Sequence, residues 1–200
     1  MIKKSAFTAS LALLAALALG QPASAKEIVR SFRQQIPIGT AIRIHLDFPV
    51  GEVKVEAWDS PQVDLDVKIT CNEMSNRCEE AAKALRLVHS GSDGQLEIKV
   101  KDWPHFGATK GLNVDATLRV PRNLPLRADL GVGEVHVSLP KEAIGSAAID
   151  TGIGEASLVA NGRRYSSGGL ITRAIHWDKG LGHARVKVDC GVGEIHVTLA

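Results

Sequence analysis

The nine-residue stretch Asp129–Val137 decides the fold of this chain; it reads DLGVGEVHV and recurs in close copies. The other copies are DFPVGEVKV at Asp47–Val55, DTGIGEASL at Asp150–Leu158 and DCGVGEIHV at Asp189–Val197. An internal repeat means that one supersecondary unit is used several times. The geometry of this phrase therefore sets the architecture.

Around the copies, apolar and polar residues alternate at period two. The alternation is clear over Val63–Cys71, Leu96–Val100 and Val114–Val120, and it is typical of strands with one buried and one solvent-exposed face. Glu79–Leu85 breaks the pattern with good helix formers and with acidic residues at its start. The sequence therefore predicts an all-β chain with one short helical insertion.

Within the phrase, the apolar face changes sides. In the second copy Ala128, Leu130 and Val132 share one face, whereas Val135 and Val137 follow after a separation of three. A strand that keeps its apolar side inward through such a switch must bulge or turn a corner, which glycine permits. We therefore predict a corner in each copy, with Val132 facing the core. The structural corner glycines are Gly51, Gly131, Gly133, Gly152, Gly154, Gly191 and Gly193.

The spacing of the later copies predicts a stack. Asp129 and Asp150 lie 21 residues apart, and Asp150 and Asp189 lie 39 apart. A period of roughly 20 residues in an all-β sequence suits rungs that each bury an apolar face on the next. Stacked rungs would align three exterior columns: Asp129, Asp150 and Asp189; Glu134, Glu155 and Glu194; and His136, Ser157 and His196.

These columns contain residue types that bind metals. Stacked carboxylates suit Ca²⁺, but the strong calcium signature is a shorter, glycine-rich repeat. The two histidines with Glu134 or Glu194 would suit a transition metal. If the rung of Ser157 lies between them, however, they are too far apart to share an ion. We therefore interpret the columns as solvated surface residues, and we predict no metal site and no cofactor.

The first residues predict export. Lys3 and Lys4 precede a run of Leu and Ala over 11–19, and Ala23-Ser24-Ala25 follows. This pattern is typical of a secretory signal peptide. We expect a signal peptide over 1–25, cleavage after Ala25, and a single domain over 26–200 that is periplasmic or secreted. The apolar run is too short to span a bilayer, so we do not expect an integral membrane protein.

The predicted mature chain has balanced charge. The sequence has 24 basic and 22 acidic residues, and removal of Lys3 and Lys4 makes the two numbers equal. Binders of nucleic acids and of anionic membranes rely on an excess of Lys and Arg. We therefore expect neither kind of partner.

The cysteines suit an oxidising compartment. Cys71 and Cys78 flank a predicted loop between a strand and the helix. We expect a disulfide that joins these elements rather than a redox pair, whose usual spacing is C-x-x-C. Cys190 takes the repeat position of Phe48 and Leu130, which indicates a small buried side chain.

Two further segments end predicted strands, Val55-Glu56-Ala57-Trp58 and Leu118-Arg119-Val120-Pro121. With the glycine corners, they resemble a bacterial family of exported β-repeat proteins labelled putative adhesins, the toast-rack-like group, which has no assigned function. This chain has Val132, Ile153 and Val192 where that family usually has small or polar residues. The resemblance implies a right-handed β-helix or stacked β-sandwich-like repeat fold and a non-enzymatic role in the cell envelope.

No catalytic constellation stands out. The sequence has no G-x-S-x-G, no H-E-x-x-H and no phosphate loop, so we predict no catalytic residues. The alternative function is a glycan-active enzyme of β-helix type, a lyase or hydrolase, which needs two carboxyl groups in an external groove. Trp58, Trp103 and Trp177 are candidates either for stacking on sugars or for anchoring the core.

We therefore predict a binding or structural, adhesin-like module rather than an enzyme. Its expected partner is an envelope protein or a glycan. The last copy runs almost to Ala200, so we also expect self-association through the C-terminal rung, where an unpaired strand edge would be exposed.

Overall fold

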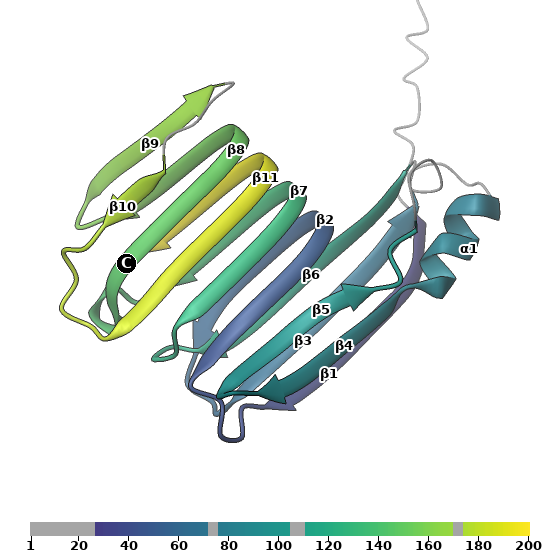
Figure 1. Cartoon of the computed structure of the whole chain (residues 1–200), viewed down its shortest axis with the longest axis horizontal. Helices are drawn as coiled ribbons and strands as arrows, with labels where there is room; N and C mark the ends of the chain where they lie inside the picture. The colour runs from purple at the N-terminus through teal and green to yellow at the C-terminus, as the bar shows by residue number, and fades with distance from the viewer. Residues whose placement is uncertain (1–26, 72–75, 105–110, 170–173) are drawn as a thin grey trace, which may run out of the picture.

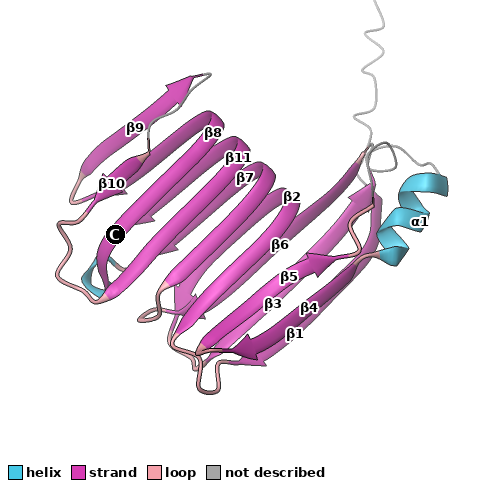
Figure 2. Ribbon diagram, viewed as in Figure 1, coloured by secondary structure: helices cyan, strands magenta, loops and turns pink. Residues whose placement is uncertain are grey.

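The computed structural model describes residues 27–71, 76–104, 111–169 and 174–200, and most of these residues lie in β-strands (Figure 2). The prediction of an all-β chain with one short helix is confirmed for this part of the chain. The predicted signal peptide lies outside the described residues. The elements are β1 (Glu27–Pro37), β2 (Arg43–Trp58), β3 (Gln62–Cys71), α1 (Asn76–Ala84), β4 (Arg86–Ser92), β5 (Gln95–Lys101), β6 (Leu112–Pro121), β7 (Leu126–Leu139), a 3₁₀ turn (Lys141–Ala143), β8 (Ile144–Ala160), β9 (Arg163–Gly169), β10 (Ile175–Trp177) and β11 (Ala184–Leu199).

The strands form one open mixed sheet with the order β1-β3-β6-β2-β7-β11-β8-β10. The long central strands fold over along their length, so the sheet has two arms that face each other (Figure 1). The pairing of β2 shows this division, because Arg43–Asp47 pairs with β5 whereas Val53–Trp58 pairs with β6. Similarly, the first half of β8 pairs with β10 and its second half pairs with β9.

The four copies of the repeat lie side by side, parallel and in identical register. Asp47 pairs with Asp129, Asp129 with Asp189, and Asp189 with Asp150. The spatial order is therefore β2-β7-β11-β8, and the fourth copy lies between the second and the third. The prediction that rungs stack in chain order is wrong. β9 and β10 cover the outer edge of β8, which leaves its inner edge for β11.

This order also corrects the prediction about the C-terminal rung. β11 is paired on one side with β7 and on the other with β8. Its backbone donors and acceptors are therefore used within the sheet, so the prediction that this rung exposes an unpaired strand edge for self-association is wrong. The right-handed β-helix stays a prediction.

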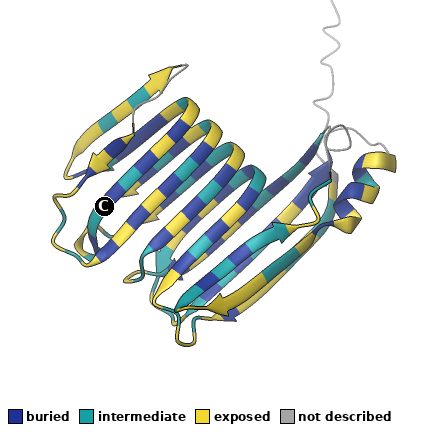
Figure 3. Cartoon of the chain, in the orientation of Figure 1, coloured by how far each residue is buried: buried dark blue, intermediate teal, exposed yellow. Residues whose placement is uncertain are grey.

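The core lies between the two arms, and it is built by alternation. On β7, Leu130, Val135, Val137 and Leu139 are all buried, while their neighbours are not. Figure 3 shows the resulting bands of buried and exposed residues along every long strand. At the corner the prediction for Val132 is wrong: it is 47 % exposed, and its counterparts Ile153 and Val192 are 47 % and 42 % exposed. These three side chains lie on the outside of the bend.

Two features explain the glycines at the bend. Gly51, Gly133, Gly154 and Gly193 have φ values between 130° and 142°, which side chains rarely adopt. A Cβ at Gly193 would also lie 1.8 Å from the carbonyl oxygen of Gly133. Gly131, Gly152 and Gly191 lack the positive φ, yet a Cβ at Gly131 would lie 2.3 Å from the Pro49 carbonyl oxygen. Close approach of neighbouring strands therefore requires glycine at these positions of the bend.

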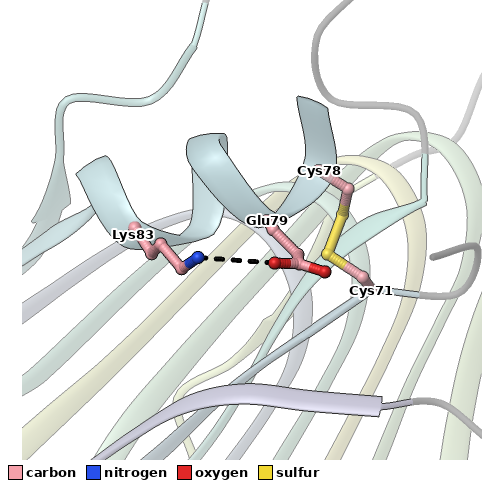
Figure 4. The surroundings of a disulfide bond; sticks show 4 residues. All are labelled: Cys71, Cys78, Glu79 and Lys83. Atoms are coloured by element: carbon pink, nitrogen blue, oxygen red, sulfur yellow. Dashed lines mark hydrogen bonds and ion pairs between the residues drawn. A yellow bond between two sulfur atoms is a disulfide. The ribbon is translucent and has the colours of Figure 1, made fainter. Parts of the chain in front are cut away.

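The helix is attached to the sheet at both of its ends. Cys71 at the end of β3 forms a disulfide with Cys78 in α1, as predicted, and Glu79 pairs with Lys83 on the helix surface (Figure 4). At the other end, Arg30 of β1 donates hydrogen bonds to the carbonyl oxygens of Lys83 and Leu85 at 2.7 and 2.9 Å. Cationic donors suit the carbonyl end of a helix.

The remaining cysteine, Cys190, is buried and has a free thiol, as predicted. Burial raises the pKa of this thiol, against weaker opposing hydrogen bonds to the backbone of Val192 and Gly133. Among the described helices, none combines the length and apolar character that a membrane span needs.

Candidate functional site

The polar residues of the repeat lie on the outside of the bent strands and form columns across the sheet. On one side of the corner the column is Asp47, Asp129, Asp189 and Asp150. On the other side two columns run in parallel: Glu52, Glu134, Glu194 and Glu155, then Lys54, His136, His196 and Ser157. The predicted columns therefore exist, with the members in the spatial order of the strands.

Basic side chains pair with two aspartates of the first column, Asp129 and Asp189. Arg127 Nε lies 2.9 and 3.0 Å from the two carboxylate oxygens of Asp129, and His45 Nε2 lies 2.7 Å from one of them. Lys187 pairs with Asp189 at 2.8 Å. Burial opposes ionisation of Asp129, but the hydrogen bonds from Arg127 and His45 outweigh it and lower the pKa of the carboxyl. Asp129 and Asp189 therefore form an ion-pair network on the outer face of the sheet.

The glutamate and histidine columns form a different network, which we call the Glu/His ladder (Glu52, Glu134, Glu194, His136 and His196). His136 Nε2 lies 2.7 Å from Glu134 Oε1 and 3.6 Å from Glu52 Oε1. His196 Nε2 lies 3.2 Å from Glu194 Oε2 and 3.6 Å from Glu134 Oε1. Glu134 therefore faces both imidazoles.

The two imidazoles are held in place by the strand register. Because β7 and β11 are neighbours, the rings of His136 and His196 stack with centroids 5.1 Å apart and an interplanar angle of 23°. Ser157 Oγ lies 2.9 Å from His196 Nδ1, so it orients that ring with its Nε2 toward the glutamates. Both rings are about one-third exposed, at 36 % and 32 %. A solute can therefore reach them.

Next to this ladder, a trough of about 850 Å³ runs over the outer faces of β2, β6, β3 and β1. Most of its lining is charged, with both signs interspersed. Arg33 pairs with Asp66 at 2.6 Å, and Arg119 pairs with Asp64. The remaining charged residues of the lining are Glu52, Lys54, Glu56, Lys68 and Asp115.

Ion pairs hold three carboxylates of the trough to neighbouring basic side chains. Asp64 pairs with Arg119, Asp66 with Arg33 and Glu52 with Lys54. A glycosidase site, by comparison, needs one carboxylic acid opposite a second carboxylate in a groove.

The tryptophans act mainly as anchors. Trp177 is 3 % exposed. Trp58 donates a 2.7 Å hydrogen bond to the Gln62 carbonyl oxygen, and the Arg119 guanidinium covers its ring at 4.9 Å. Trp103 packs against the core. The Trp177 ring is buried and the Trp58 ring is covered by Arg119, so neither ring supports the hypothesis of sugar stacking.

Sequence reasoning missed the contact between His136 and His196, because it left open whether the rung of Ser157 lies between them. The sequence feature that indicates this contact is the 39-residue separation of Asp150 and Asp189, which is nearly twice the 21 residues between Asp129 and Asp150. That gap contains β9 and β10, which occupy one edge of β8 and direct the last copy to the other edge.

No family model matches this chain, and no curated protein matches it. Several solved structures are similar to this chain, and two of them have low sequence identity to it. A protein from Clostridium sporogenes described as a putative cell adhesion protein has 14 % identity and a TM-score of 0.43, over 86 % of this chain and 99 % of that one. A protein from Parabacteroides distasonis described as a putative lipid binding protein has 13 % identity and a TM-score of 0.29, over 84 % of this chain and 65 % of that one.

Proposed function

We propose that this chain is an exported, non-enzymatic module of the cell envelope, periplasmic or secreted, that binds a charged partner in the trough. The observation that carries the proposal is the trough itself, with basic and acidic side chains from four strands on one surface. The sequence supports export through its signal-peptide pattern.

The lining indicates the chemistry of the partner. It contains no aromatic residue on which a neutral sugar would stack. Arg33, Lys54, Lys68 and Arg119 offer positive charge beside acidic neighbours. Electrostatic complementarity of this kind favours specificity and fast association. The partner class that fits is an envelope protein segment or a glycan that carries both charges.

The test compares binding by the wild type and by a trough variant, Arg33→Glu with Lys68→Glu. Two probes are used: cross-linking in a bacterial envelope fraction, and sedimentation with isolated peptidoglycan. We expect the wild type to be captured by one probe, with capture reduced at least about tenfold in the variant and weakened by salt.

A matched control reverses two exposed basic residues outside the trough, Arg163→Glu and Arg185→Glu. This control changes the net charge by the same amount, so it should retain capture. Equal loss in both double variants would show that only net charge matters, and equal capture by the wild type and the trough variant would exclude the trough. Release of soluble glycan fragments during incubation would instead support the alternative function, a glycan-active lyase or hydrolase.

A further inference from the structure

We propose that the Glu/His ladder is a binding site for divalent transition-metal ions, with Glu134 as a ligand shared by two adjacent triads. The first triad is Glu52, Glu134 and His136, and the second is Glu134, Glu194 and His196. Within each triad the ligand atoms all lie within 4.8 Å of one another. This inference is independent of the partner proposed for the trough.

The distances are close to those of a coordination shell. With metal–ligand distances of about 2.0–2.1 Å, two ligand atoms on one tetrahedral ion lie about 3.4 Å apart. His136 Nε2 to Glu52 Oε1 and His196 Nε2 to Glu134 Oε1 are both 3.6 Å. The shorter separations, 2.7 Å from His136 to Glu134 and 3.2 Å from His196 to Glu194, are hydrogen-bond distances that must open slightly. Rotamer adjustments on the order of 1 Å therefore complete each triad.

The surroundings of the ladder favour a metal ion there rather than elsewhere on the repeat. In the aspartate column, Arg127 and Lys187 already supply positive charge. In the Glu/His ladder, Glu52 pairs with Lys54 at 2.7 Å, but the carboxylates of Glu134 and Glu194 face imidazoles. An imidazole binds a metal as a neutral ligand, through a ring nitrogen that carries no proton.

A hydrogen bond with Ser157 orients His196 for metal binding, and this supports the proposal independently of the distances. Metal-binding histidines usually use their other ring nitrogen in a hydrogen bond that fixes the ring. Ser157 Oγ lies 2.9 Å from His196 Nδ1 and takes this place. Ser157 is the third-copy counterpart of the two histidines, and its side chain is buried. The column thus contains both the ligands and the residue that positions one of them.

The ligand set indicates the class of ion. One nitrogen and two carboxylate oxygens per triad suit Zn²⁺, Ni²⁺ or Cu²⁺, whereas Ca²⁺ requires six to eight oxygens. Each triad leaves a position open to solvent or to a partner's side chain. An ion in the first triad lies beside the trough, because Glu52 lines both.

The experiment titrates the purified full chain with ZnCl₂ by calorimetry and with CuCl₂ by electron paramagnetic resonance. We expect up to two ions per chain, with nitrogen hyperfine structure in the copper spectrum. His136→Gln and His196→Gln should each remove one of the two binding events. Glu134→Gln should weaken both by at least about tenfold, because the ligand is shared.

The matched control is His176→Gln, which changes an exposed histidine on β10 outside the ladder. It should bind Zn²⁺ and Cu²⁺ like the wild type, and circular dichroism should show that every variant is folded. Absence of Zn²⁺ and Cu²⁺ binding by the wild type would overturn the proposal. Unchanged binding in Glu134→Gln, or a response to Ca²⁺ alone, would overturn it as well.

Discussion

At the scale of single residues, the bend depends on the absence of side chains. Gly133 and Gly193 have positive φ values, and each would place a Cβ less than 2 Å from a carbonyl oxygen of the next strand. In three of the four copies, the carbonyl that this Cβ would meet belongs to the equivalent glycine of the neighbouring copy. At Gly51 it belongs to Val114 instead. The glycines therefore form a stacked column in which every member limits the space of the next.

This arrangement predicts that Gly193→Ala destabilises the protein strongly. The unusual φ costs about 1–3 kcal/mol and crowding of the backbone costs about as much again, so we expect a loss of about 3 kcal/mol or more. Urea denaturation measures the free energy of unfolding. Gly169→Ala is the matched control, since Gly169 has φ 131° but open space around its Cβ position. A similar loss in both variants would show that close approach is not the cause.

A second prediction concerns Asp129, whose pKa is lowered because the hydrogen bonds from Arg127 and His45 outweigh burial. A folded-state pKa below the ordinary value contributes stability that is complete above about pH 3.9 and is lost as the pH falls through the lower folded value. We expect Asp129→Asn to cost about 2 kcal/mol at pH 7. The difference from the wild type should shrink below about pH 4.

Urea denaturation of both proteins between pH 7 and pH 3 measures this difference. Asp59→Asn serves as the control, because Asp59 is 74 % exposed and pairs only at the surface with Arg122. Such a pair contributes at most about 1 kcal/mol. A difference for Asp129→Asn that is constant down to pH 3 would contradict a role for its charge.

At the scale of elements, the helix is stabilised by its connections to the sheet. α1 has only nine residues, and isolated helices of this length are marginal in water. The Cys71–Cys78 disulfide and the hydrogen bonds of Arg30 place it against β3 and β1. The helix therefore depends on tertiary contacts for its stability.

We predict that Cys71→Ser with Cys78→Ser lowers the free energy of unfolding by about 2–3 kcal/mol, as expected for closing a loop of this length. Addition of dithiothreitol should reduce the stability of the wild type by a similar amount and leave the double variant unchanged. Cys190→Ser is the control, since Cys190 is a free thiol. Persistent sensitivity of the double variant to dithiothreitol would contradict the assignment of the disulfide.

The sequence is sufficient to predict the strands that alternate clearly and the polar columns, but not β1, β4, β9 or β10, and not the order of the strands. Period-two alternation identified stretches such as Val114–Val120, and the repeated letters set the register because identical copies bury the same positions. The neighbour of each strand, however, depends on which edges other elements already occupy. For this reason the contact between His136 and His196, and with it the ladder, follows only from the structure.

The side of the bend on which Val132 lies is a related limit. Alternation assigned it to the core, because residues two apart along a straight strand share a face. At Gly133 the positive φ bends the backbone, so residues two apart no longer share a face there. Val132 therefore projects outward and is 47 % exposed. Sequence patterns predict faces along straight strands, and they fail where the backbone bends.

At the scale of the whole molecule, the last segment of the chain lies in the middle of the sheet. β11 joins β7 to β8, so the sheet is continuous only after the C-terminal strand has been placed. Among the described strands, β9 pairs with β8 alone and lies at the periphery (Figure 1). Stability should therefore be distributed by position in the sheet rather than by position in the chain.

Native-state hydrogen exchange tests this distribution. Amides of β11 such as Val188 and Ile195, both fully buried, should exchange only through global unfolding, with the same free energy as urea denaturation gives. Amides of β9 should exchange through local opening, at a free energy lower by about 2 kcal/mol or more. β7 is the internal control, because it is also flanked on both sides. If β11 instead exchanged as readily as β9 while β7 remained protected, the C-terminal copy would be a peripheral rung, and the ladder of His136 and His196 that depends on its central place would be excluded with it.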